Sequence, residues 1–191
     1  MDLYKKYRVN QTHQELELTD SVSAEVLFAK EKPEVVFMAA GRAGNLNRCI
    51  THPATLYSKN SMIQNNVFAA SCKYGVQHLV YFGSSCIYPE NVVQPIKEES
   101  LFNGPLEEAT SGYAAAKLSG VLACKAYNNQ YFNGKCRFIP IIPNTVYGPN
   151  DHCDIENSHV FSALIRRFFQ AKKTNARRFL NAIQVKISII L

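Results

Sequence analysis

A tyrosine and a lysine four residues apart are the first residues in this sequence that could do chemistry together. Tyr113-Ala-Ala-Ala-Lys117 lies in a predicted helix, so both side chains are expected on one helix face. A nearby ammonium stabilises phenolate and lowers the pKa of a tyrosine. Tyr113 would then donate a proton to a carbonyl oxygen near neutral pH. By itself, the spacing is equally typical of an exposed pair on a helix surface.

Two further segments bring polar groups toward the same place. Ser84 and Cys86 follow one predicted buried strand, and Asn144 follows another. In an open parallel sheet, ligands bind beyond the carboxyl ends of the strands. The three segments are therefore predicted to converge on one crevice, where Ser84 would donate a hydrogen bond to a substrate oxygen. Taken alone, Ser84 would be an ordinary turn residue.

Cys86 could act as a base in that crevice. A thiol beside cationic groups and dipoles loses its proton more easily. The alternative is a small buried apolar residue, and this is the role expected for Cys49, Cys72, Cys124 and Cys136. His159 stands near the start of a predicted helix, where a surface or capping role is the alternative to a chemical one.

The elements that must position these groups alternate between strand and helix. Such alternation is typical of βαβ units around a parallel sheet, and we expect an α/β fold with a doubly wound, Rossmann-like sheet. The predicted strands cover residues 34–40, 78–83 and 137–142. The predicted helices cover residues 20–32, 53–74, 112–131 and 158–173. Segments 41–51 and 84–111 are predicted loops, and a loop as long as the second is usually functional.

Composition excludes several classes of protein. The chain has 191 residues and 47% apolar residues, enough for a core and too many for a disordered chain. The net charge of +6 comes largely from a C-terminal stretch, which favours a solvated helix face and a basic tail over nucleic-acid binding. Six cysteines without CxxC or zinc-type spacing predict no metal site, and no apolar run is long enough to cross a membrane. We expect a cytoplasmic protein with reduced thiols.

Together these segments resemble the extended short-chain dehydrogenase/reductases of the NAD-dependent epimerase/dehydratase family. The most specific match is Gly83-Ser-Ser-Cys-Ile-Tyr-Pro89, which is similar to the motif of the GDP-L-fucose synthase group. Gln94-Pro95, the Glu107-to-Lys117 region and Asn157-Ser-His-Val160 also resemble that group, and the resemblance covers about residues 13–174. A sugar 4,6-dehydratase would carry Asp-Glu after the serine, and a UDP-hexose 4-epimerase would carry a small residue in place of Cys86.

The resemblance implies an epimerase-reductase that acts on GDP-4-keto-6-deoxymannose or a related 4-keto sugar with NADPH, NAD being the alternative cofactor. It implies that Cys86 and His159 are the base and acid for epimerisation at C3 and C5. In the reduction at C4, the matching roles are that Ser84 orients the keto oxygen, Tyr113 protonates it, and Lys117 holds the ribose.

The resemblance also implies binding residues. Ala40 and Gly41 would border the cofactor, Asn144 would lie beside the nicotinamide and the sugar, and Arg167 would contact the substrate diphosphate. The helices predicted over 53–74 and 112–131 resemble those through which family members form homodimers.

An incomplete enzyme is expected from the same resemblance. No Gly-x-x-Gly-x-x-Gly is present to receive the cofactor pyrophosphate. Gly41-Arg-Ala-Gly44 is not expected to replace it, because the next helix is predicted to start only near Pro53. We divide the chain into a partial NAD(P)-binding Rossmann domain (1–150), the start of a substrate domain (151–174) and a divergent tail (175–191) such as a frameshift would leave. We expect low stability, weak cofactor binding and little turnover from this chain alone.

Two other functions remain open on the sequence. One is a related reductase or epimerase that acts on a modified heptose or deoxyhexose for surface polysaccharide. The other is a non-catalytic chain that binds a nucleotide sugar or pairs with a full-length paralogue through the two long helices.

Overall fold

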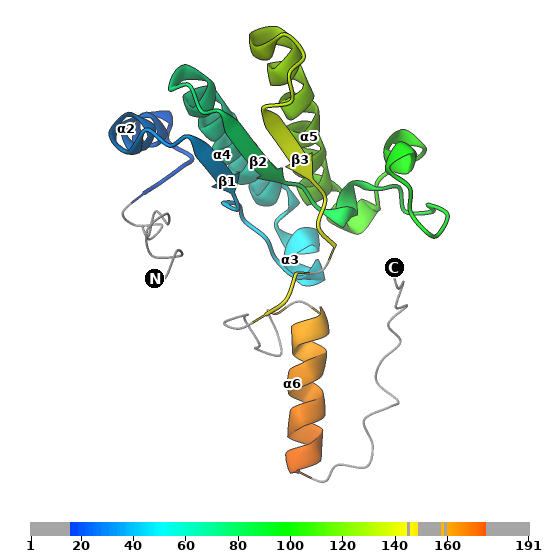
Figure 1. Cartoon of the computed structure of the whole chain (residues 1–191). Helices are drawn as coiled ribbons and strands as arrows, with labels where there is room; N and C mark the ends of the chain where they lie inside the picture. The colour runs from blue at the N-terminus through cyan, green and yellow to red at the C-terminus, as the bar shows by residue number, and fades with distance from the viewer. Residues whose placement is uncertain (1–15, 145, 149–157, 159, 175–191) are drawn as a thin grey trace.

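The computed structural model describes residues 16–144, 146–148, 158 and 160–174 (Figure 1). At its centre lies a parallel sheet with the strand order β1-β2-β3, formed by β1 (Val35–Met38), β2 (His78–Phe82) and β3 (Phe138–Ile141). In the middle of the register, Val80 pairs with Phe37 on one side and with Ile139 on the other. The α/β fold with a parallel sheet is thus confirmed.

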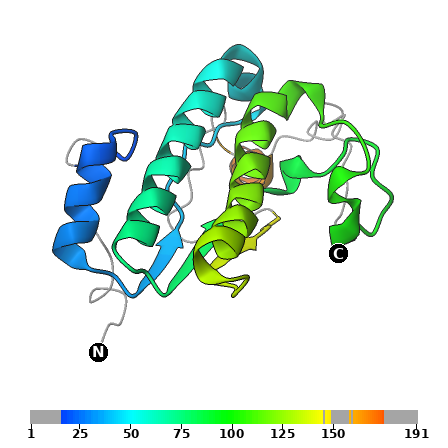
Figure 2. The ribbon, with the colours of Figure 1, turned by 90° about the horizontal axis from the view of Figure 1, so that it is seen from above.

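Helices α2 (Ser21–Glu31), α4 (Pro53–Lys73) and α5 (Ser111–Phe132) lie side by side on one face of this sheet (Figure 2). Alternate strand residues point into the core between helices and sheet, among them Met38, Leu79, Tyr81 and Phe138, each at most 4% exposed. On the other face, Phe37 is 69% exposed. Helices α2, α4 and α5 therefore form one layer of the expected doubly wound arrangement.

Local sequence signals explain where the helices begin and end. Asp20 caps α2 by accepting a hydrogen bond of 2.8 Å from the Ser23 N–H. Pro53 occupies the first turn of α4, where its missing N–H leaves no bond unmade. Beyond the end of α4, Gly75 adopts a φ of +73°, a conformation that favours glycine.

The two predicted loops contain short helices that sequence periodicity did not reveal. α3 (Leu46–Thr51) lies within 41–51, so the expectation of a loop up to Pro53 was wrong. Asn45 starts α3 by accepting a hydrogen bond from the Arg48 N–H at 3.0 Å, a capping signal without an apolar stripe behind it. The 84–111 segment contains three 3-10 turns: η1 (Ser85–Ile87), η2 (Glu98–Phe102) and η3 (Glu108–Thr110).

After β3 the chain leads to α6 (Val160–Lys173), which extends away from the sheet on the side of the strands' carboxyl ends (Figure 1). The described part of the chain contains no helix that is long and apolar enough to cross a membrane.

Asn128 joins the end of α5 to the start of β3. Its Oδ1 accepts hydrogen bonds from the backbone N–H groups of Arg137 (3.1 Å) and Phe138 (2.9 Å). Its Nδ2 donates to the Phe138 carbonyl at 2.8 Å. One side chain thus binds three backbone groups where β3 begins, at the edge of the described sheet.

We expect Asn128→Ala to lower the free energy of unfolding by roughly 2–4 kcal/mol, because it leaves the N–H and the carbonyl of the buried Phe138 without the partner that Asn128 provides. The Arg137 N–H keeps its bond to the Lys135 carbonyl at 3.0 Å. The adjacent Asn129 is exposed, so Asn129→Ala is the matched control and should change stability by less than about 0.5 kcal/mol. Urea unfolding followed by circular dichroism measures both. Equal losses in the two variants would contradict the assignment.

Candidate active site

The end of β2 delivers Ser84 and Cys86 to the carboxyl edge of the sheet. Gly83 continues the ladder, since its N–H donates to the Ile141 carbonyl at 2.8 Å. The Ser84 backbone then remains extended, and its Oγ accepts a hydrogen bond of 3.4 Å from the Cys86 N–H at the start of η1. Both side chains are half-buried. The short turn therefore holds a hydroxyl and a thiol together.

Helix α5 brings Tyr113 to the same place. The Tyr113 phenol forms a hydrogen bond with the Ser84 side chain, and it is close enough to Cys86 for the two groups to interact electrostatically. The predicted convergence of Ser84, Cys86 and Tyr113 thus appears in the structure. A proton donor, a hydroxyl and a thiol, from two separate segments, line one small region.

Lys117 lies one turn along α5, and its side chain is buried. Lys117 is 8% exposed, and its Nζ donates a hydrogen bond of 2.8 Å to the carbonyl of Phe82, the last residue of β2. The ammonium also lies 6.0 Å from the centre of the Tyr113 ring. Burial lowers the pKa of Lys117 to about 8.

The prediction that the pKa of Tyr113 is lowered was wrong. Burial raises the pKa of Tyr113, and the neighbouring thiol of Cys86 raises it further. The hydrogen bond with Ser84 acts in the opposite direction but does not compensate. The spacing of four residues does place Lys117 beside the ring, but the loss of water around the phenol outweighs the effect of a nearby cation.

A clamp formed by Asn60 holds the loop after β1 against this site. The Asn60 Oδ1 accepts from the Arg42 N–H at 2.8 Å, and its Nδ2 donates to the Arg42 carbonyl at 2.9 Å and to the Leu56 carbonyl at 2.7 Å. Asn60 is buried on α4, and helical periodicity gives no sign that its amide would bind a loop. The loop backbone is thereby fixed beside α5.

The same loop fits the expected role of Ala40 and Gly41 in bordering a cofactor. A Cβ atom on Gly41 would stand 2.9 Å from the Asn60 Oδ1 and 3.6 Å from the Lys117 Nζ, so only glycine lets the backbone pass here. Ala40 is half-buried and Gly41 is exposed. The Lys117 ammonium has three N–H donors, and the Phe82 carbonyl takes one of them. Donors on Lys117 next to an open glycine backbone are suited to the hydroxyls of a ribose.

The three remaining predicted residues have different outcomes. Asn144 lies just beyond β3, and its Oδ1 accepts a hydrogen bond of 3.2 Å from the Ser85 hydroxyl, so it belongs to the same edge of the sheet. Arg167 lies half-buried on α6, and its contact with a diphosphate stays a prediction. His159 lies outside the described residues.

Among the other cysteines, Cys49 belongs near the site. It is 7% exposed on α3, and its pKa is raised by burial, then by Cys86 and Glu107. Its electrostatic effect also reaches Tyr113. No spacing in the sequence links Cys49 to Cys86, so this neighbourhood arises only from the fold. Cys124 is buried as expected and Cys72 is half-buried, whereas Cys136 is exposed in a turn before β3, contrary to the expectation.

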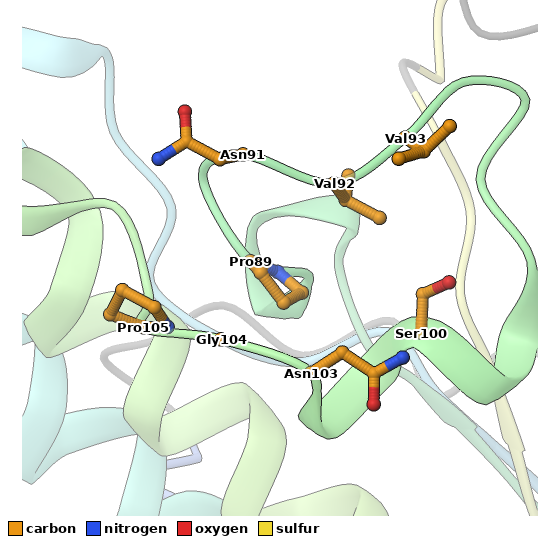
Figure 3. Close-up of a pocket in the computed structure, with 8 residues that line it drawn as sticks. All are labelled: Pro89, Asn91, Val92, Val93, Ser100, Asn103, Gly104 and Pro105. Carbon is orange, nitrogen blue, oxygen red and sulfur yellow. The ribbon is translucent and has the colours of Figure 1, made fainter.

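A separate cavity of about 240 Å³ lies within the 84–111 segment (Figure 3). Its lining consists of Pro89, Asn91, Val92, Val93, Ser100, Asn103, Gly104 and Pro105. The antiparallel bridge between Pro89 and Leu106 closes the base of this segment. None of the reactive groups at the strand ends lines the cavity, so it is distinct from the candidate active site.

Comparison with known proteins agrees with this arrangement. The pattern of the NAD dependent epimerase/dehydratase family matches residues 3–184. The chain belongs to this family. It is 44% identical over 168 residues to "Putative GDP-L-fucose synthase 2" of Arabidopsis thaliana, covering 88% of this chain and 50% of the relative. The chain thus spans about half the length of the curated relative it matches.

Solved structures of the family superpose well on the chain. A GDP-D-glycero-L-gluco-heptose synthase from Campylobacter jejuni, in the presence of NADPH, is 40% identical with a TM-score of 0.79, over 86% of this chain and 48% of that one. A GDP-L-fucose synthetase from Naegleria fowleri, bound to NADP, is 26% identical with a TM-score of 0.79, over 91% of this chain and 56% of that one. Both solved structures are named as a synthase or synthetase of a GDP-linked sugar.

The buried Lys117 predicts a specific dependence of stability on pH. The pKa of Lys117 is about 8 in the folded chain and near its ordinary 10.5 when unfolded. Between these values the unfolded chain binds more protons, so the contribution of Lys117 to stability rises with pH. We expect the unfolding free energy of the parent, relative to Lys117→Met, to rise by up to about 3 kcal/mol from pH 7 to pH 10.

Taking the difference between variants removes the titration of the other groups. Lys125→Met, at an exposed position of the same helix, is the matched control for removal of a lysine side chain. Urea unfolding at each pH measures both differences. A flat difference for Lys117→Met would show that this lysine does not titrate as a buried group.

Proposed function

We propose that this chain carries the catalytic half of a nucleotide-sugar epimerase-reductase resembling GDP-L-fucose synthase, with NADPH as the hydride donor. The observation that carries the proposal is the meeting of Ser84, Cys86 and Tyr113 at the end of β2, beside the buried ammonium of Lys117. A hydroxyl, a phenol and a lysine suit reduction of a carbonyl, and a thiol next to them suits removal of a proton from the adjacent carbon.

Each group has a part in the proposed reaction. The keto group at C4 acidifies the protons at C3 and C5, and Cys86 as thiolate removes them, while His159 returns protons on the opposite face. NADPH, when bound, supplies hydride to C4. Ser84 then holds the keto oxygen by a hydrogen bond, and Tyr113 gives it the proton that completes the alcohol. Lys117 binds the ribose hydroxyls and, as a cation, favours loss of the Tyr113 proton.

The contacts of Ser84 and Asn144 support the roles proposed for them. The Ser84 hydroxyl is bound to Tyr113 and to the backbone of Cys86, so it stands between the two chemical functions. Asn144 reaches the same edge through Ser85, which supports its proposed place beside nicotinamide and sugar. The Arg167 contact with the diphosphate is proposed from resemblance.

A homodimer through α4 and α5 is part of the proposal. These helices pack on each other and still expose large apolar side chains, namely Tyr57, Met62 and Leu122, at 43–49% of their surface. Apolar surface of this kind on two adjacent helices favours burial against another chain. A cytoplasmic location stays a prediction.

A second candidate is a reductase or epimerase that acts on a GDP-linked heptose. It is favoured by the likeness to the Campylobacter jejuni heptose synthase at 40% identity. A third, a non-catalytic partner of a longer paralogue, is favoured by the exposed apolar side chains of α4 and α5.

The first experiment titrates the purified chain with NADPH and with GDP, and follows retention by fluorescence and calorimetry. We expect both to bind, but NADPH only weakly, because the sequence has no Gly-x-x-Gly-x-x-Gly loop to receive its pyrophosphate. Light scattering run in parallel tests the third candidate, since a dimer that ignores NADPH would favour it over the enzyme. Competition between a GDP-linked 4-keto deoxyhexose and a GDP-linked 4-keto heptose for binding shows which of the first two candidate functions is favoured.

The second experiment separates the two chemical steps. In D₂O, proton removal by Cys86 should exchange the C3 and C5 protons of the 4-keto sugar for deuterium, without NADPH. We expect Cys86→Ser to slow this exchange by on the order of 100-fold or more. Tyr113→Phe should leave exchange intact and slow reduction by a similar factor. Mass spectrometry of the sugar measures both.

Cys136→Ser removes an exposed thiol from the same chain and serves as the matched control. It should exchange at the parental rate. Parental exchange in Cys86→Ser would exclude this thiol as the base, and equal loss of both steps in Tyr113→Phe would contradict the division of roles.

A further inference from the structure

Tyr81 lies among the buried residues that hold the site in place. Its position in the middle of a strand does not predict such a role from the sequence. It is 1% exposed in β2 and points to the face that α4 and α5 cover. Its hydroxyl donates a hydrogen bond of 2.8 Å to the Oε1 of Gln64 on α4. The phenol of a strand residue is thus fixed by a helix.

Gln64 binds the neighbouring helix with its other end. It is 3% exposed, and its Nε2 donates to the Ala116 carbonyl at 3.0 Å and to the Ser119 hydroxyl at 2.8 Å. These two α5 residues flank Lys117. A single amide therefore joins Tyr81 to the helical turn that carries the buried lysine.

The packing around this pair leaves no room for displacement. A Cβ atom on Gly120 would collide with the Tyr81 hydroxyl and stand 2.7 Å from the Gln64 Oε1. Phe68 meets the Tyr81 ring edge to face, with 5.4 Å between ring centres. The ring is therefore held from the side by Phe68 and at its hydroxyl by Gln64.

The Lys117 ammonium lies over this fixed ring. Its Nζ is 5.2 Å from the centre of the Tyr81 ring, nearer than the 6.0 Å to the Tyr113 ring. A cation within about 6 Å of an aromatic face is attracted by the ring's electrons, most strongly where water is excluded. Burial acts against the charge, whereas the ring and the Phe82 carbonyl act for it.

We propose that Tyr81 is a positioning residue for Lys117: its ring, held in place by Gln64, supports the ammonium and keeps it charged inside the protein. The inference deepens the proposed function and rests on it for its catalytic meaning, since a neutral Lys117 would neither bind ribose hydroxyls as a cation nor favour proton loss from Tyr113. Tyr81 touches neither substrate nor cofactor in this account and acts through Lys117.

The ionisable groups around Lys117 come from several elements. Tyr81 and Tyr113 present their rings to the ammonium, and Cys124 on α5 interacts electrostatically with Tyr81. Across the site, Cys86 and Cys49 interact with Tyr113. The adjoining loop after β1 carries Arg42, whose backbone is bound by Asn60. None of the variants chosen below replaces any of these groups, apart from Tyr81 itself.

The test measures the titration of Lys117 in the full chain without any ligand. Competitive acetylation over a pH series, read by mass spectrometry, reports its titration midpoint. We expect Tyr81→Leu, which removes the ring, to lower the midpoint by about one pH unit. Tyr81→Phe, which keeps the ring but loses the hydroxyl bonds to the Gln64 Oε1 and the Lys117 carbonyl, should lower the midpoint by much less than Tyr81→Leu. It should also lose stability, because the Gln64 Oε1 loses its donor.

Phe138→Leu is the matched control. It removes a fully buried ring from the same aromatic cluster, whose ring contacts among the described residues are with Phe68, Tyr127 and Phe132, so it should destabilise the chain and leave the midpoint unchanged. If Tyr81→Leu does not fold, a series of fluorinated phenylalanines at position 81 weakens the ring's attraction at nearly constant shape. The midpoint should then fall with each added fluorine.

Three results would overturn the inference: an unchanged midpoint in Tyr81→Leu or across the fluorinated series, an equal fall in Phe138→Leu, or an equal fall in Tyr81→Phe. Titration with NADPH is read separately. A parent chain that retains no NADPH would count against the proposed function, while the ligand-free midpoints would still decide the role of Tyr81.

Discussion

The hydrogen bond between the Lys117 ammonium and the Phe82 carbonyl is the contact on which the rest of the site depends. A lysine that is 8% exposed keeps a charge only where acceptors and ring faces replace water. Phe82 provides such an acceptor because a parallel strand ends there, and Gly83 is already bound to β3. The chain then turns away through Ser84, so the same strand end that receives the ammonium also supplies the hydroxyl bound to Tyr113.

Two buried amide side chains, one turn apart on helix α4, also hold the site in place. Asn60 binds the backbone of the loop after β1, and Gln64 binds α5 and the Tyr81 hydroxyl. Amides suit this task because each offers both donors and an acceptor, and a buried backbone group needs one or the other. The consequence is a site whose three supporting segments, a loop, a strand and a helix, are tied to one rigid element, as precise chemistry requires.

Much of this could be predicted from sequence, and the failures have identifiable causes. The long helices carry periodic apolar stripes and recognisable ends, such as Pro53 and Gly75, so local rules were sufficient. Helix α3 was not predicted because six residues are too few to show a periodic apolar stripe, and the capping residue Asn45 was the only signal of a helix. The pKa of Tyr113 was expected to fall from its spacing to a lysine, but spacing carries no information on burial, which here raises it. Cys136 was assigned to the interior by residue type alone, yet it lies exposed in a turn.

The sequence by itself determined the parallel α/β framework, the family motif and the meeting of Ser84, Cys86 and Tyr113 at one edge of the sheet. Hydrophobic periodicity is a local property that locates the strands, and in a parallel sheet the carboxyl ends of all strands lie at the same edge. Only the tertiary structure decided which groups surround them. The contact of Lys117 with Tyr81, the clamp by Asn60 and the nearness of Cys49 join residues up to tens of positions apart, and such neighbours are chosen by how helices pack on the sheet. The same packing removes water, and the balance between lost hydration and new contacts then sets the charge of each buried group.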